Sequence, residues 1–183
     1  MGGVPWLKGR RVLDLFDDSD IDIELPVLRV LMSLNLEFYQ LILAGQKFHE
    51  FRKRYATKDQ RSQWFVYLTA PEARLAPVID LDVPIVDTPD RIAAIAEHGR
   101  AGNGASVADY LADRAEGTAL PLRHVREYEG FTGEQLAVEL GSWHPPQGYI
   151  LIDQHPDLAA VCDRLITGQI VRELPVRPPA PIS

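Results

Sequence analysis

The side chains best suited to chemistry lie in a charged stretch that follows Gly45. The polar pattern there has a period of two, which predicts a strand with Glu50 and Arg52 on one face, about 7 Å apart. A carboxylate and a guanidinium at this spacing can pair directly or through a ligand. Lys47 precedes them, and desolvation beside Arg52 would favour its neutral amine, a proton acceptor or nucleophile. A structural ion pair with an exposed lysine explains the pattern equally simply.

Basic residues are concentrated at the end of this strand. Between positions 52 and 61 only Asp59 is acidic, and the basic residues are Arg52, Lys53, Arg54, Lys58 and Arg61. The net charge of −7 argues against a protein that coats duplex nucleic acid, because such binding neutralises many phosphates. A small basic patch on an acidic chain suits a short or single-nucleotide ligand. A solvated loop without a ligand remains the simple alternative.

Several other chemistries have no support in the sequence. It contains no Walker-type phosphate loop, no GxSxG elbow and no HExxH zinc motif. Alternation on a strand explains Asp80 and Asp82, and the single cysteine, Cys162, fits a buried thiol, so we predict no metal and no cofactor. No apolar run is long enough to cross a bilayer and no secretory signal is present, which predicts a cytoplasmic protein.

The charged strand is one element of a predicted mixed sheet. Apolar runs predict strands over 27–34, from Gln63, from Pro77, over 120–128 and over 148–152. The proline of the third run indicates a sheet edge. Start and stop signals predict helices over 35–45, 88–98, 106–117, 132–141 and 156–168, and the proline-rich segment from Glu173 is predicted to be extended and mobile. Because strands and helices do not alternate regularly, we expect a mixed sheet or small barrel.

Residues 43–54, LAGQKFHEFRKR, resemble the ILxGxKxxExRxR signature of ASCH domains, which are relatives of the PUA fold. The preceding VLMSLNLEFYQ is similar to the family's opening strand and helix, and PPQGY at 145–149 is similar to its closing strand. The resemblance extends from Val27 to Ile152. It implies an α+β fold, a small PUA-like β-barrel with flanking helices and a helical insertion over 88–117, with a cleft lined by Lys47, Glu50 and Arg52.

Members of this family are generally RNA- or nucleotide-binding, and some are ribonucleases or amidohydrolases of N4-acylated cytidines. The resemblance therefore implies a basic cleft for a short single-stranded RNA or a modified nucleotide. The expected ligand-binding residues supply cations for phosphate, aromatic rings for stacking a base and one amide, and they are Lys47, Arg52, Lys53, Arg54, Tyr55, Trp64, Tyr67 and Gln147.

A hydrolase acting on nucleosides or RNA is the first alternative function. Lys47 would be its base or nucleophile activator, Glu50 its acid/base and Arg52 its electrostatic stabiliser. The amidohydrolases of the family carry a nucleophilic threonine three residues after the lysine, and Glu50 occupies that position here.

A protein-interaction module is the second alternative. It would use the extensions over 1–26 and 153–183, which we expect to flank the domain formed by 27–152. A further hypothesis is that the acidic run over 17–24 covers the basic cleft.

Overall fold

The computed structural model describes residues 26–179, so most of the predicted N-terminal extension and its acidic run lie outside the described residues. The strands are β1 (Leu28–Leu34), β2 (His49–Arg52), β3 (Ser62–Leu68), β4 (Arg74–Leu81), β5 (Ile85–Asp87), β6 (Gly117–Thr132), β7 (Tyr149–Leu151) and β8 (Ile170–Pro175). The helices are α1 (Leu36–Leu43), α2 (Pro89–Gly99), α3 (Asn103–Leu111), α4 (Gly133–Leu140) and α5 (Pro156–Ile166), with a 3-10 turn η1 (Ile152–Gln154).

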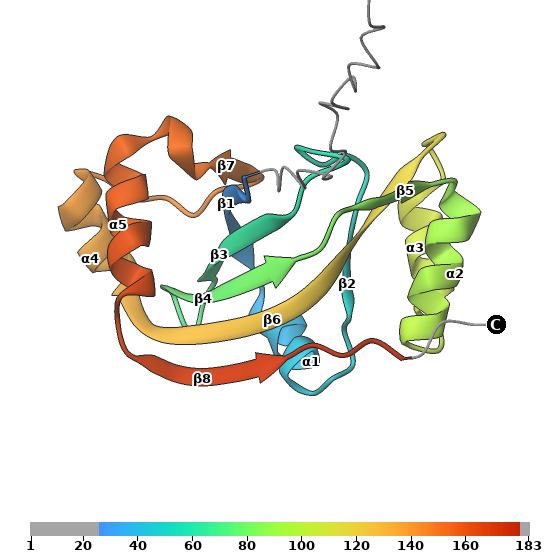
Figure 1. The fold of residues 1–183 in the computed structure, drawn as a ribbon, viewed down its shortest axis with the longest axis horizontal. Coiled ribbons are helices and arrows are strands. Elements are labelled where there is room, and N and C mark those ends of the chain that lie inside the picture. Colours follow the sequence, from blue (N-terminus) through green and yellow to red (C-terminus); the bar gives the residue numbers. More distant parts are fainter. Residues whose placement is uncertain (1–25, 180–183) are drawn as a thin grey trace, which may run out of the picture.

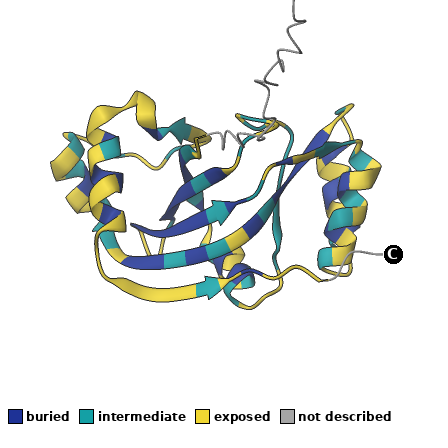
Figure 2. Cartoon of the chain, viewed as in Figure 1, coloured by how far each residue is buried: buried dark blue, intermediate teal, exposed yellow. Residues whose placement is uncertain are grey.

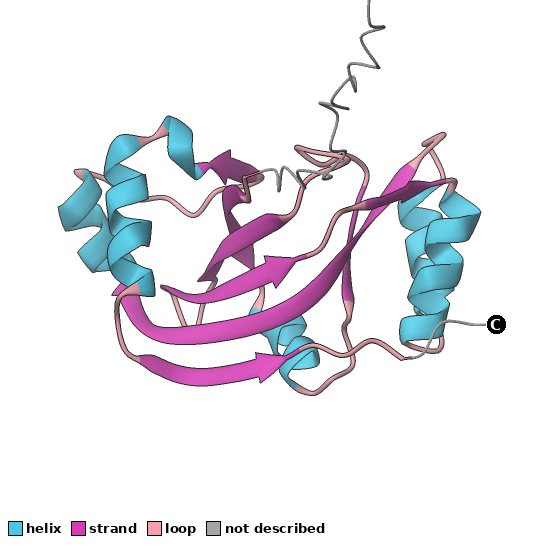
Figure 3. Ribbon diagram, in the orientation of Figure 1, coloured by secondary structure: helices cyan, strands magenta, loops and turns pink. Residues whose placement is uncertain are grey.

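The strands form one mixed sheet in the order β2-β6-β4-β3-β1-β7, and β5 and β8 pair with parts of β6. β1 and β3 are parallel, whereas β1 with β7, β2 with β6 and β4 with its neighbours are antiparallel. The sheet curls, with α4 and α5 at one end and α2 and α3 at the other (Figure 1; Figure 3). The predicted α+β class with a small, curled barrel-like sheet is confirmed.

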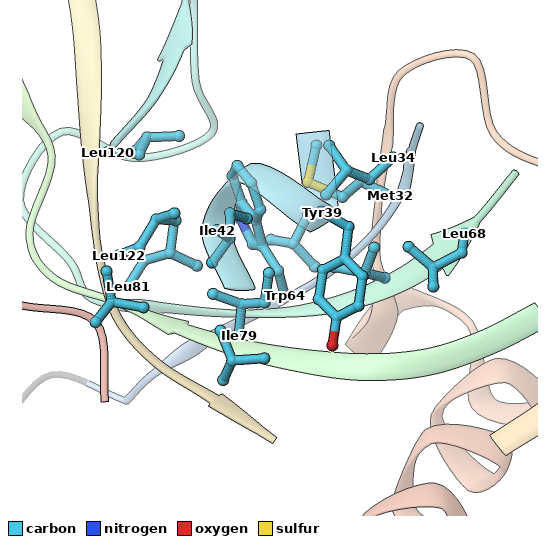
Figure 4. Packing of buried hydrophobic residues seen from close by; sticks show 14 residues of the cluster. Met32, Leu34, Tyr39, Ile42, Trp64, Leu68, Ile79, Leu81, Leu120 and Leu122 are labelled. Atoms are coloured by element: carbon cyan, nitrogen blue, oxygen red, sulfur yellow. The ribbon is translucent and has the colours of Figure 1, made fainter. Parts of the chain in front are cut away.

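Two hydrophobic clusters fill the two faces of this sheet, and neighbouring buried residues of the strands belong alternately to one and the other. Figure 2 shows how burial varies along these strands. On the inner face, Tyr39 and Ile42 of α1 pack against side chains of β1, β3, β4 and β6 (Figure 4). On the outer face, α4 and α5 cover the sheet, and the fully buried Cys162 lies among them. Because β3 is covered on both faces, its apolar run is continuous, as predicted for a central strand.

Local signals place the helix ends correctly in two cases. α1 is followed by Gly45 at φ 65°, a conformation that costs glycine nothing. α4 begins with a complete capping box, in which the Thr132 hydroxyl accepts from the N–H of Gln135 and the Gln135 side chain accepts from the N–H of Thr132. α4 ends at Gly141, again with positive φ.

Three predicted elements need correction. Pro77 does not mark an edge: β4 lies between β3 and β6, and the β4–β6 register shifts between Leu75 and Pro77, a bulge that accommodates a residue without N–H. α3 begins at Asn103 rather than Ser106, because the Glu97 carboxylate accepts from the N–H groups of Gly102 and Gly104 and takes the place of a cap.

The third correction concerns the C-terminal segment, which was predicted to be extended and mobile from Glu173. Instead β8 pairs with β6, with Glu173 opposite Arg126 and Pro175 opposite His124. Val176 follows in the inner cluster and is 8% exposed. Residues 156–176 therefore pack on the same sheet as the rest of the described chain.

Candidate ligand-binding site

Glu50, on β2, pairs with two cations. Its carboxylate oxygens lie 2.9 Å from Nζ of Lys47 and 3.1 Å from Nη2 of Arg52. The side chains of Lys47, Glu50 and Arg52 are 16%, 15% and 29% exposed, so the cluster is shielded but accessible to solvent. The predicted pairing of Glu50 with Arg52 on one face of the strand is present, and Lys47 joins it. One carboxylate against two cations leaves the cluster with a net positive charge.

The turn between α1 and β2 positions the lysine. The backbone N–H groups of Gln46 and Lys47 both donate to the carbonyl oxygen of Leu41, at 2.8 and 3.1 Å, which holds the chain against the end of α1. The Lys47 ammonium then lies 5.4 Å from the centre of the Phe38 ring. An aromatic face within about 6 Å of a cation attracts it, so Phe38 is a second partner of Lys47.

Arg52 lies on the inner side of the sheet, against the aromatic side chains of the barrel. Its guanidinium carbon is 5.9 Å from the centre of the Trp64 ring. Tyr55, just beyond β2, donates to Ser62 at 2.8 Å and accepts from Trp64 Nε1 at 2.6 Å. Burial is the main cause that raises the pKa of Tyr55 above its usual value. The Tyr55 side chain is therefore neutral and is held in place beside Arg52 by its two hydrogen bonds.

The loop that follows β2 contacts β7, the strand at the other end of the sheet order. Tyr149 of β7 lies 5.9 Å from Tyr55, measured between ring centres, and 42% of Tyr149 is exposed. Because β2 and β7 are the two ends of the sheet order, this contact lies at the seam of the curled sheet. Glu50 and Arg52 lie on the β2 side of that seam.

The opposite face of β2 packs against α2 and α3. His49 stacks on Phe51, with ring centres 6.1 Å apart, and Phe51 contacts the cluster formed by α2, α3 and β6. Burial, followed by the charge of Lys47 and that of His98, lowers the pKa of His49 to about 4. Lys47 and His49 border a small cavity of about 80 Å³ on this side. His49 is neutral at physiological pH and serves packing there.

A larger pocket of about 560 Å³ opens just beyond the end of β2. Its lining includes Tyr55, the basic residues Lys53, Arg54, Lys58 and Arg114, and the acidic residues Asp113 and Glu116. Lys53 pairs with Asp113 at 2.5 Å and Lys58 with Glu116 at 2.9 Å. Arg54 is exposed and has no ion pair within residues 26–179. The basic residues of the pocket thus outnumber its acidic residues, and one cation, Arg54, pairs with no carboxylate of the described chain.

Trp64 and Tyr67 cannot stack a ligand base in this structure, which corrects the expectation for both. Trp64 is 1% exposed and Tyr67 is 4% exposed, with Trp64 in the middle of the inner cluster (Figure 4). Tyr67 lies in the outer cluster, 5.2 Å from the ring centre of Trp143. Their odd separation on β3 places them on opposite faces of the sheet. Gln147 is exposed in the loop before β7, and within residues 26–179 it makes no hydrogen bond to the cluster.

Three exposed aromatic residues beside the site were missed by sequence reasoning. Phe38 contacts Lys47, Tyr149 contacts Tyr55, and Tyr110 of α3 lies 5.2 Å from Nζ of Lys53. The only signal in the sequence was that Phe38 and Tyr110 are large apolar residues on helices, a feature shared with core residues. Their exposure depends on tertiary packing.

Within residues 26–179, no group of three or more His, Cys, Asp or Glu side chains could hold a metal ion. No helix of this part of the chain is long and apolar enough to cross a membrane. Asp80 and Asp82 have arginine partners instead: Arg126 at 2.5 Å from Asp80 and Arg61 at 3.2 Å from Asp82.

Comparison with known proteins identifies the fold. The chain is similar to crystal structures of the ASCH protein of Zymomonas mobilis. Two mutant forms of that protein align with TM-scores of 0.61 and 0.60 at 20% and 19% identity, covering 75% and 76% of this chain and 95% and 96% of theirs. A third structure aligns with a TM-score of 0.58 at 21% identity, over 72% of this chain and 94% of that one. No family model and no curated protein matches the sequence.

The described chain therefore has the ASCH fold, as the motif at residues 43–54 predicted. At this level of identity the likeness concerns the fold. The roles of Lys47, Glu50 and Arg52 remain predictions that rest on their own geometry.

Proposed function

We propose that this chain binds single-stranded RNA or a nucleotide at the Lys47–Glu50–Arg52 cluster and the basic pocket that follows it. The observation that carries the proposal is the continuity of positive charge along one short segment. Lys47 and Arg52 share a single carboxylate, and the 560 Å³ pocket begins at the next residue, Lys53. Arg54 adds a cation without an ion pair.

A phosphate suits this arrangement better than a neutral ligand. Guanidinium groups bind phosphate oxygens with two parallel hydrogen bonds, and charge-assisted bonds of this kind are about twice as strong as neutral ones. Arg52 is held by Glu50 and by the Trp64 ring, so it loses little side-chain freedom when a phosphate binds. Tyr149 provides an exposed aromatic surface nearby for a base.

The contacts of Lys47 favour binding over hydrolysis. A base or nucleophile at this position needs a neutral amine, and the expectation was that Arg52 would help to produce it. Lys47 is instead engaged in an ion pair with the Glu50 carboxylate, 2.9 Å away. The ammonium is a hydrogen-bond donor, as a phosphate ligand requires.

Titration of a fluorescent six-nucleotide single-stranded RNA, followed by anisotropy at several salt concentrations, tests the proposal. Wild-type protein should bind with a logarithmic salt slope of about −0.7 for each neutralised phosphate, giving about −2 for three contacts. Arg52→Gln and Arg54→Gln should each reduce both the affinity and the slope. Arg164→Gln is the matched control, because Arg164 lies on α5 and pairs with Glu139 at 2.6 Å. Binding that is insensitive to salt, or equal in all four proteins, would refute the proposal.

A further inference from the structure

Exposed aromatic side chains are few in the described chain, and all of them lie at the candidate site. Among residues 26–179, the aromatic side chains classed as exposed are Phe38 at 45%, Tyr110 at 43% and Tyr149 at 42%. The other exposed large apolar residues are aliphatic and include Val138 at 85% on α4. A fold that buries Trp64 and Phe65 almost completely leaves these three rings in solvent.

Two of the rings lie against cations of the site. Phe38 is 5.4 Å from the Lys47 ammonium, and Tyr110 is 5.2 Å from that of Lys53. An exposed cation–π contact stabilises less than burial of the ring's apolar surface would, so this contact alone does not explain why each ring is left in water. Such a pair can, however, hold a base on the ring and the neighbouring phosphate on the cation.

The third ring, Tyr149, lies on β7 and contacts Tyr55 just beyond β2. Its neighbour Tyr55 is hydrogen-bonded to Trp64, whose ring lies below Arg52. Arg52 is therefore linked to Tyr149 through Trp64 and Tyr55. An exposed aromatic ring with a basic side chain against it therefore occurs twice at the site, and Tyr149 adds a third exposed ring.

The two ring–cation pairs lie at opposite ends of β2. Lys47 precedes the strand and Lys53 follows it, so the backbone between the two residues spans at most about 20 Å. In Figure 1, α1, which carries Phe38, lies near the start of β2, and the end of α3, which carries Tyr110, lies near its other end. β2 is an end strand of the sheet order, and within residues 26–179 it pairs only with β6, so no strand of this part of the chain covers its other edge. A ligand that contacts both ring–cation pairs must therefore reach from one end of β2 to the other.

Building on the proposed function, we propose that the site binds a single-stranded RNA of at least three nucleotides laid along the free edge of β2. Successive bases stack on Phe38, Tyr149 and Tyr110, and Lys47, Arg52 and Lys53 contact the phosphates between them. Duplex RNA does not fit, because paired bases cannot present their faces to protein rings. Lys53 changes partners in this complex, from Asp113 to phosphate; both side chains are partly exposed, so the exchange costs little.

The test compares ligand length with ring removal. Affinities of the wild type for a mononucleotide, a trinucleotide and a hexanucleotide RNA are measured by calorimetry, together with those of Phe38→Ala, Tyr110→Ala and Tyr149→Ala. Affinity should rise by at least tenfold from one to three nucleotides. Each alanine variant should weaken hexanucleotide binding about tenfold, equivalent to about 1.4 kcal/mol and within the range for one stacked base.

Two further variants separate stacking from nonspecific effects. Tyr110→Phe keeps the ring and should bind the hexanucleotide like the wild type. Val138→Ala removes a more exposed apolar side chain on α4, away from the site, and should change nothing.

The outcomes distinguish the two proposals. If a mononucleotide binds as tightly as the hexanucleotide and the alanine variants match the wild type, the extended strand is refuted while nucleotide binding stands. If none of the three RNAs binds, both proposals fail.

Discussion

Replacing Glu50 with glutamine should destabilise the protein through the loss of one charge. The variant keeps the size of the side chain and leaves Lys47 and Arg52 without an anion. With an effective dielectric constant of about 20, each pair near 3 Å is worth about 5 kcal/mol of Coulomb energy before desolvation is subtracted. Breaking a fully buried pair costs about 3–5 kcal/mol, and the 29% exposure of Arg52 reduces this. We expect a loss of about 2 kcal/mol in the free energy of unfolding.

Thermal unfolding followed by circular dichroism measures this loss. For a chain of this length about 2 kcal/mol lowers Tm by about 4–8 °C. Glu116→Gln is the matched control, because Glu116 is also 2.9 Å from a lysine, Lys58, but both side chains are more than 60% exposed. That exposed pair should contribute less than about 0.5 kcal/mol. Equal Tm values for Glu50→Gln and the wild type would mean that the shielded cluster does not form in solution.

Three further predictions concern the surrounding structure. Because the pKa of His49 is lowered to about 4 in the folded protein, the unfolded chain binds the extra proton first as the pH falls. The free energy of unfolding should therefore fall between about pH 6.5 and 4, by up to about 1.4 kcal/mol per pH unit. Urea unfolding at several pH values should show a shallower decline for His49→Gln. Gly130→Ala should cost at least about 2 kcal/mol more than Gly141→Ala in urea unfolding, because both glycines have positive φ but only at Gly130 would the added Cβ meet backbone atoms within van der Waals distance. Tyr39→Phe should lower the free energy of unfolding by about 1–2 kcal/mol in the same assay, because the Tyr39 hydroxyl donates at 2.9 Å to the buried Glu127 carboxylate. An unchanged urea midpoint would mean that water replaces this hydrogen bond.

The parts of the fold that could be predicted are those set by neighbours in sequence. The period-two pattern after Gly45 was sufficient to place Glu50 and Arg52 on one face, because strand geometry alone determines it. The capping box at Thr132 is equally local. Pro77 was misjudged because its tolerance in a central strand depends on a bulge against β6, a contact between segments about fifty residues apart.

The candidate site was predictable in its charges and less so in its rings. The basic residues adjoin one another in sequence, whereas the aromatic residues come from α1, α3 and β7. Tyr67 was named with Trp64 although their odd spacing already opposes a shared face. Whether a ring is buried, as Trp64 is, or exposed, as Tyr149 is, depends on which elements cover it, and hydrophobicity alone does not reveal that.

β8 also bears on the order in which the sheet can assemble during synthesis. β6 pairs with β8 on one edge, and β8 is translated only after α4, β7 and α5. One edge of β1, the first strand of the described chain, likewise stays without a pairing strand until β7 has been synthesised. A nascent chain that has reached β6 therefore presents two strands with unpaired backbone groups, which can pair with other chains. Folding intermediates of this protein are consequently most exposed to aggregation between the synthesis of β6 and that of β8.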